Sequence, residues 1–135
     1  MKELKIVART DNLDQVISFV DESLEEADCS IKAQMQIDVA VEEIFVNIAQ
    51  YAYTSQEGEA VIRLDTETVP GAVVITFIDS GIPFDPLAVQ EPDVTLSIKD
   101  RKIGGLGIFM VKKSMDDVTY KYVDNKNILT IKKNI

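Results

Sequence analysis

The sequence predicts a two-layer α+β sandwich, in which helices lie on one face of a mainly antiparallel sheet. Two observations support this fold class. Helix-like and strand-like segments follow one another in the order β-α-α-β-β-loop-α-β-β. Two pairs of strand-like segments are also joined by short turns, which favours antiparallel pairing with the helices grouped on the sheet.

The first strand and the first helix follow from the pattern of the N-terminal residues. Lys2–Arg9 alternates between its two faces, with Leu4 and Ile6 on the apolar one, as a half-buried strand does. Thr10 or Asp11 can cap the following helix. Its apolar residues recur at helical spacing from Leu13 to Leu24.

A break at Cys29-Ser30 precedes a long helix, which we expect from about Ile31 to Tyr53. Two β-rich segments follow it, Glu59–Val69 and Ala72–Ile78. The dipeptide Pro70-Gly71 between them is a strong turn signal, so the two segments are expected to pair as neighbours.

A long loop is expected after this pair of strands. Asp79–Lys102 contains three prolines and mixed charges. Loops longer than about 12–15 residues in a compact domain are usually functional or disordered. The remaining expected elements are a helix near Ile108–Met115 and two strands, Val118–Val123 and Ile128–Lys133, joined around Asp124–Asn127.

The composition excludes several classes of function. The 135 residues suit a single domain over residues 1–135, and 14 Lys and Arg against 23 Asp and Glu give a formal net charge of −9. Because the chain has no His and one Cys, His-based triads, most zinc sites and an internal disulfide are excluded. The acidic balance disfavours nucleic acid and anionic membranes. Without a bilayer-spanning run or a signal peptide, we expect a cytoplasmic protein.

The long helix carries two polar residues on an otherwise apolar stretch. Glu43 and Asn47 lie four positions apart, so their side chains share one helix face. A carboxylate and a carboxamide together can serve a divalent cation that prefers oxygen ligands. The alternatives are a solvated stripe or a capping interaction.

A second polar motif, Asp79-Ser80-Gly81, comes directly after an apolar strand. A carboxylate at the end of a buried strand is well placed to accept a hydrogen bond in a cleft. Gly81 lets the backbone approach a flat ligand, because no Cβ intervenes. As structure alone, the same three residues form a turn.

A third motif, Gly104-Gly105-Leu106-Gly107, precedes the last helix. Such a loop presents backbone N–H groups and a positive helix terminus to an anion, which suits phosphate. It is neither a Walker A motif nor a Gly-x-Gly-x-x-Gly motif after a strand. A glycine-rich helix cap is the alternative.

The three motifs in this order resemble those of the GHKL ATPase superfamily. The resemblance spans about residues 31–116, and the flanking strands fit the Bergerat-type α/β sandwich. The chain is most similar to the small stand-alone anti-sigma factor/serine-protein kinase group, through its length and the segments Glu43–Ala49, Asp79–Asp85 and Gly104–Ile108. The single-domain length and the lack of His disfavour a complete sensor histidine kinase.

The resemblance implies that the ligand is ATP with Mg²⁺. It assigns Asn47 to Mg²⁺ through the carboxamide oxygen, and Asp79 to the adenine amino group, with Gly81 making room for the ring. It assigns Glu43 the role of general base.

The same resemblance assigns the triphosphate to the third motif. Gly104, Gly105, Leu106 and Gly107 would wrap it with backbone donors, and the long loop would act as a lid. Lys99, Arg101 and Lys102 in that loop either touch phosphates or form a solvated surface cluster. Tyr51, at a position where many relatives carry His, and Tyr53 are expected in the core or the pocket wall.

The function implied by the resemblance is that of an ATP-dependent serine kinase. Such a protein phosphorylates a small anti-sigma antagonist protein and regulates a sigma factor, hence transcription, by partner switching; relatives commonly form homodimers. The alternative is an ATP-gated protein-binding module without phosphoryl transfer. Glu43 favours the kinase, because a nucleotide sensor has little need of a base near the γ-phosphate.

Overall fold

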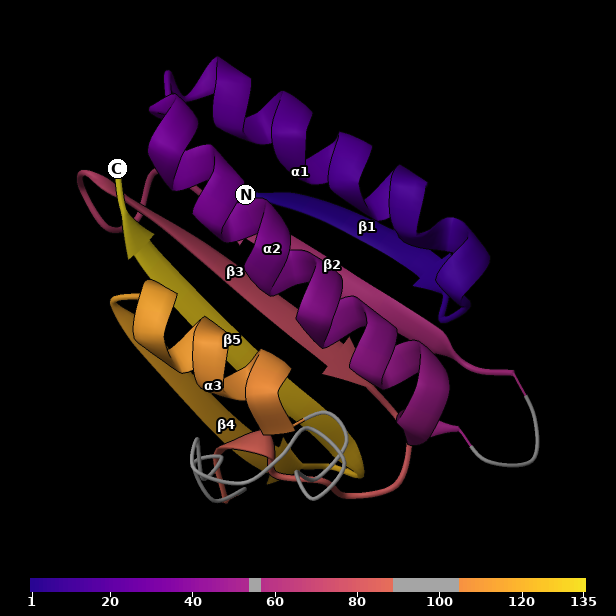
Figure 1. Ribbon diagram of the computed structural model, residues 1–135. Coiled ribbons are helices and arrows are strands. Elements are labelled where there is room, and N and C mark those ends of the chain that lie inside the picture. The colour runs from indigo at the N-terminus through magenta and orange to yellow at the C-terminus, as the bar shows by residue number, and fades with distance from the viewer. Residues whose placement is uncertain (54–56, 89–104) are drawn as a thin grey trace.

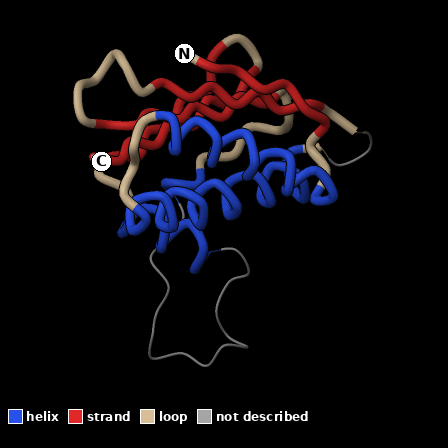
Figure 2. The backbone as a smooth tube through the Cα atoms, turned by 90° about the horizontal axis from the view of Figure 1, so that it is seen from above, coloured by secondary structure: helices blue, strands red, loops and turns tan. Residues whose placement is uncertain are grey.

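The computed structural model describes residues 1–53, 57–88 and 105–135. Within these residues, five strands form one antiparallel sheet in the order β1-β2-β3-β5-β4. The helices of this part of the chain lie together on one face of the sheet, as Figures 1 and 2 show. The predicted two-layer α+β sandwich is therefore confirmed.

The observed elements follow the predicted order. The strands are β1 (Lys2–Val7), β2 (Glu59–Asp65), β3 (Ala72–Asp79), β4 (Asp117–Val123) and β5 (Lys126–Asn134). The helices are α1 (Leu13–Glu26), α2 (Ile31–Asn47) and α3 (Gly105–Ser114), with short 3₁₀ turns η1 (Thr10–Asn12) and η3 (Pro86–Ala88) and a π-helical turn η2 (Ile48–Ala52).

The core lies between the two layers, where one stripe of each helix meets one face of the sheet. Burying a large apolar side chain there contributes about 1.5–3 kcal/mol. Large side chains in this core include Leu24, Ile37, Phe45, Ile62, Phe77 and Ile131.

No helix in the described part of the chain is long and apolar enough to cross a membrane.

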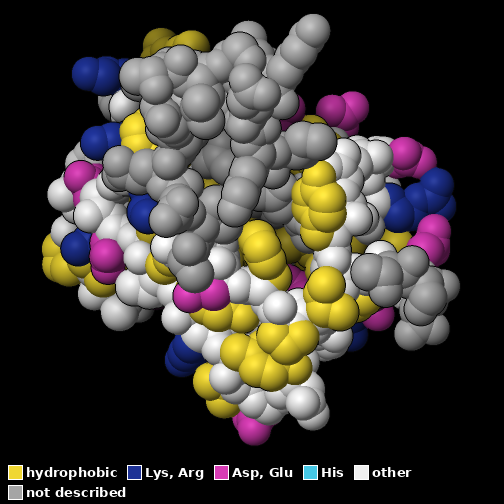
Figure 3. All heavy atoms as spheres, turned by 60° about the horizontal axis from the view of Figure 1, so that its bottom comes forward, with side chains coloured by type: hydrophobic (Ala, Val, Ile, Leu, Met, Phe, Trp, Pro, Cys, Tyr) yellow, Lys and Arg dark blue, Asp and Glu magenta, His cyan; other side chains and the backbone are white. Residues whose placement is uncertain are grey.

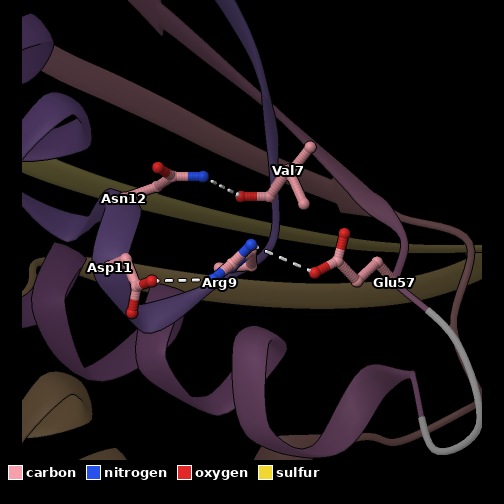
Figure 4. A network of polar contacts seen from close by, with 5 residues as sticks. All are labelled: Val7, Arg9, Asp11, Asn12 and Glu57. Atoms are coloured by element: carbon pink, nitrogen blue, oxygen red, sulfur yellow. Dashed lines mark hydrogen bonds and ion pairs between the residues drawn. The ribbon is translucent and has the colours of Figure 1, made fainter.

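The start of α1 differs from the prediction that Thr10 or Asp11 caps it. The cap position is Asn12, which makes no side-chain cap hydrogen bond and instead donates from Nδ2 to the Val7 carbonyl at 2.9 Å. The Asp11 carboxylate pairs with the Arg9 guanidinium at 2.8 Å (Figure 4). The opposite charge two residues away attracts the carboxylate that the sequence pattern assigned to the cap.

Two strand boundaries were also predicted wrongly. β2 ends at Asp65 rather than Val69, because the Asp65 side chain accepts hydrogen bonds from the backbone N–H groups of Glu67 and Thr68 and closes a turn. In the last hairpin, Asp124 and Asn125 have φ values of 54° and 63°. They form a two-residue turn of the mirror-image type, which lets β5 begin at Lys126 and places Asn127 within the strand.

A pair of carboxyl groups faces across the interface between α1 and α2. One carboxylate oxygen each of Asp21 and Asp38 is buried without a hydrogen-bond partner among the described residues. Burial, followed by the neighbouring Asp21 carboxyl group, raises the pKa of Asp38 to about 7. The interface therefore favours a proton on Asp38.

We expect Asp38→Asn to stabilise the protein above pH 7. The folded pKa lies above the ordinary value of 3.8, so the free energy of unfolding falls as the pH rises from about 4 to 7 and the carboxyl ionises. Discounted for partial exposure, the gain at pH 8 is roughly 1 kcal/mol, or about 3–5 °C in Tm. Thermal unfolding at pH 4 and pH 8 measures it, with exposed Glu42→Gln on the same helix as control. Equal Tm values for the parent and Asp38→Asn at pH 8 would contradict it.

Candidate functional site

A pocket opens at the end of the sandwich where β3 and η2 end and α3 begins. Figure 3 turns this end toward the viewer, and hydrophobic side chains gather near its centre. Its lining comes from α2 and η2, β3 and the segment after it, α3, β4 and β5. The apolar lining residues include Ile44, Ile48, Ala52, Phe77, Ile108 and Leu129, and the polar ones are Asn47, Tyr51, Asp79, Tyr120 and Asn127.

Asp79 is the buried charge of the pocket. It is the last residue of β3 and is 6% exposed. Its Oδ1 accepts two hydrogen bonds of 2.9 Å, from the backbone N–H of Gly81 and from Nδ2 of Asn127. The ion pairs among the described residues do not include Asp79. The carboxylate is therefore held by neutral donors, and Oδ2 is left without a donor from the described residues.

Sequence reasoning missed Asn127, because the predicted closing turn, Asp124–Asn127, included it. The structure places it in β5, directly opposite Asp79 in the β3–β5 ladder. Period-2 alternation back from the buried Leu129 and Ile131 puts Asn127 on the inward face, and that signal could have found it.

Close packing is the first reason why residue 81 is a glycine. A Cβ on this residue would lie 2.2 Å from the carbonyl oxygen of Ala52, and the next residue, Ile82, donates its N–H to that same oxygen at 2.9 Å. Tyr53 reinforces this junction, since its hydroxyl accepts from the Ser80 N–H and donates to the Glu59 carbonyl. The predicted role of Gly81 beside a flat ring stays a prediction.

We expect Gly81→Ala to destabilise the fold. The added methyl group would meet the Ala52 backbone, which cannot move without breaking the hydrogen bond from Ile82. Overpacking of this kind costs about 1–3 kcal/mol, which thermal unfolding would show as a lower Tm. Exposed Ser80→Ala, one residue earlier, is the control. An unchanged Tm for Gly81→Ala would show that the junction relaxes freely.

Glu43 and Asn47 lie on the face of α2 that is turned toward α3 and the pocket. Asn47 is half-buried and lines the pocket. Glu43, one turn earlier, is half-buried beside the pocket, and its Oε2 lies so close to Gly107 that a Cβ there would be 2.0 Å away. The structure thus brings together a carboxylate and a glycine that the sequence places in two separate motifs.

The helix after the glycine motif starts earlier than predicted. α3 begins at Gly105, so Gly105, Leu106 and Gly107 form its first turn rather than a loop before it. The first N–H groups of a helix have no intrahelical acceptor, so they suit an anion in either case. Gly104, the cluster Lys99, Arg101 and Lys102, and most of the expected lid lie outside the described residues.

Tyr51 and Tyr53 behave as expected for pocket and core residues. Tyr51 lines the pocket and remains 47% exposed, while Tyr53 is half-buried and makes the hydrogen bonds that join η2 to the end of β3. The π-helical turn Ile48–Ala52 between Asn47 and Tyr53 departs from the predicted regular helix. Such turns often occur at functional sites.

A family model for the histidine kinase-like ATPase domain matches residues 6–133. The chain belongs to this family. The match covers nearly the whole chain, including the helix, strand and glycine motifs, and confirms the resemblance drawn from them.

Curated relatives of the histidine kinase-like ATPase domain include named protein kinases. The serine/threonine-protein kinase BtrW of Bordetella bronchiseptica is 26% identical over 102 residues, covering 76% of this chain and 71% of BtrW. The serine-protein kinase RsbW of Staphylococcus aureus is 28% identical over 85 residues, or 60% of this chain. The alignment spans about half, 54%, of that RsbW.

Solved structures share the fold of this ATPase domain at low identity. The structure of the RsbU and RsbW domains of Rv1364c from Mycobacterium tuberculosis matches with a TM-score of 0.64 and 14% identity, covering 99% of this chain and 32% of that one. The histidine kinase domain of a blue-light activated kinase from Erythrobacter litoralis matches with a TM-score of 0.55 and 16% identity, covering 93% and 60%.

Proposed function

We propose that the pocket binds ATP, with the adenine ring at Asp79. The observation that carries this proposal is the buried carboxylate at the end of β3, whose Oδ1 is occupied by two donors while Oδ2 is left to accept from a ligand. The adenine amino group is such a donor, and guanine presents a carbonyl at the same ring position. The apolar lining from Ile48, Phe77 and Leu129 suits the faces of a flat ring.

The phosphates would lie toward Asn47 and the first turn of α3. Asn47 lines the pocket with a carboxamide oxygen, the kind of ligand that Mg²⁺ accepts alongside phosphate oxygens and water. Mg²⁺, when bound, would offset phosphate charge. The backbone N–H groups of Gly105, Leu106 and Gly107 would donate to phosphate oxygens, with Gly104 as a further proposed contact.

We propose further that the protein is a serine kinase in which Glu43 is the general base. Its carboxylate lies beside the first turn of α3, where the phosphates are proposed to bind. Glu43 would take the proton of a serine hydroxyl while that oxygen attacks the γ-phosphorus, the bond to the β-phosphate oxygen breaks and ADP leaves. The named kinases among the relatives support this reaction.

The proposed substrate is a small antagonist protein, and the proposed regulated partner is a sigma factor. We propose further that the protein acts by partner switching in the cytoplasm, as a homodimer. Support comes from the named serine-protein kinase RsbW among the relatives and the RsbW domain among the structural neighbours.

Two measurements together test the proposed function. Calorimetric titration with Mg-ATP tests binding, and we expect saturable binding that GTP does not match. Incubation with γ-labelled ATP and candidate antagonist proteins tests transfer to serine. Binding without transfer to any candidate would support the ATP-gated binding module, and no binding of ATP would overturn both functions.

A further inference from the structure

Asp79 and Asn127 form a buried polar pair across two strands. They are directly opposite in the β3–β5 ladder, and each is 6% exposed. With Ser23, they are the buried polar residues among those the structure describes. Because the two residues line the pocket at its sheet floor, their contact belongs to the site and not to the interior core.

The Asn127 side chain uses its full hydrogen-bonding capacity. Its Nδ2 donates to Oδ1 of Asp79 and to the carbonyl of Ile82, both at 2.9 Å. Its Oδ1 accepts from the Tyr120 hydroxyl at 2.5 Å and from the Phe84 N–H at 3.2 Å. A carboxamide can make two donor and two acceptor bonds of this kind, so the group has no freedom to turn.

These bonds fix which end of the amide faces Asp79. Turned over, the amide would set an oxygen against the Asp79 carboxylate and an NH₂ group against the Phe84 N–H, which are two repulsive contacts. The same amide also holds the backbone of Ile82 and Phe84, whose side chains line the pocket and are each 51% exposed. Asn127 therefore joins the acidic floor of the pocket to one of its walls.

We infer that Asn127 is the positioning residue of the nucleotide site. It holds the Asp79 carboxylate in the one orientation that leaves Oδ2 free to accept a hydrogen bond from the adenine amino group. This inference rests on the proposed ATP binding and assigns Asn127 no contact with the nucleotide. It predicts that the preference for ATP over GTP depends on a residue that acts only through Asp79. The hydroxyl of Tyr120 supports it by occupying Oδ1 of the amide.

The titratable groups around Asp79 and Asn127 permit a test of this inference that is based on pH. Among the residues that the structure describes, the titratable groups around the pair are Tyr53 after η2, Glu59 beside it on β2, Tyr120 and Tyr122 on β4, and Asp85 after β3. Burial raises the pKa of Tyr53 and of Tyr120, so both hydroxyls stay neutral between pH 5.5 and 8. Asp85 is exposed.

Asn127→Asp is the decisive variant, because a protonated aspartic acid can replace the amide as a donor. At pH 8 two carboxylates would face each other, and the variant should bind ATP about 10–100-fold more weakly than the parent, with a smaller ATP-to-GTP preference. Near pH 5.5 the pair shares one proton, and most of that difference should disappear. Asn127→Leu, which can never donate, should bind weakly at both pH values.

Calorimetric titration with ATP and GTP at both pH values measures these ratios, with thermal unfolding in parallel. Exposed Asn134→Asp, on the same strand, is the control and should match the parent. If the parent binds ATP and Asn127→Asp matches it at pH 8 in affinity and base preference, the positioning role is wrong while the proposed function stands. If the parent binds no ATP, both fail. Recovery of binding in acid also shows that Asn127→Asp is folded.

Discussion

Glu43→Gln is expected to slow phosphoryl transfer to serine by about 10²–10⁴-fold, the usual contribution of a general base. The amide has nearly the shape of the carboxylate, so it should fit against Gly107 and leave the fold unchanged, but it cannot take the serine proton. Affinity for Mg-ATP should be largely unaffected, because Glu43 does not line the pocket. The effect should therefore appear in the rate of transfer and not in binding.

The matched control for this experiment is the neighbouring residue on the same helix. Glu42 is exposed, so Glu42→Gln removes the same charge without touching the site. The assay is transfer of labelled γ-phosphate to the antagonist protein, with nucleotide affinity measured on the same samples. If Glu43→Gln transfers phosphate as fast as Glu42→Gln, Glu43 is not the base, and the ATP-gated binding module becomes the better account.

Asp79→Asn is expected to lower ATP affinity by roughly 10²-fold and to reduce the preference over GTP. The two donors at Oδ1, from Gly81 and Asn127, would still require an acceptor, so the new amide must turn its oxygen toward them. Its NH₂ group then stands where Oδ2 was. A donor at that place opposes the adenine amino group and suits the guanine carbonyl, so the base preference should weaken or reverse.

Competition between ATP and GTP, measured by calorimetry, checks this prediction. Exposed Asp117→Asn on β4 removes the same charge far from the pocket floor and should behave as the parent. Thermal unfolding of Asp79→Asn separates a loss of binding from a loss of structure. Unchanged ATP affinity in a folded Asp79→Asn protein would remove Asp79 from the adenine site.

The order of the elements and the three motifs could be read from the sequence, because both depend on local chemistry. Apolar spacing distinguishes helix from strand, and Pro70-Gly71 with φ of 71° at the glycine forms the turn that its residue types favour. The four-residue spacing of Glu43 and Asn47 places them on one helix face wherever the helix lies. These features need no knowledge of distant parts of the chain.

The register of the sheet and the contacts between layers were decided by the tertiary structure. The tight turn at Asp124 and Asn125 lets β5 begin at Lys126, and the β3–β5 pairing then sets Asn127 opposite Asp79, 48 residues away in the sequence. Gly107 lies against Glu43 because α3 packs beside α2. A local pattern can place Asn127 on the inward face of its strand, but it does not identify the partner, which long-range pairing selects by hydrogen-bond satisfaction.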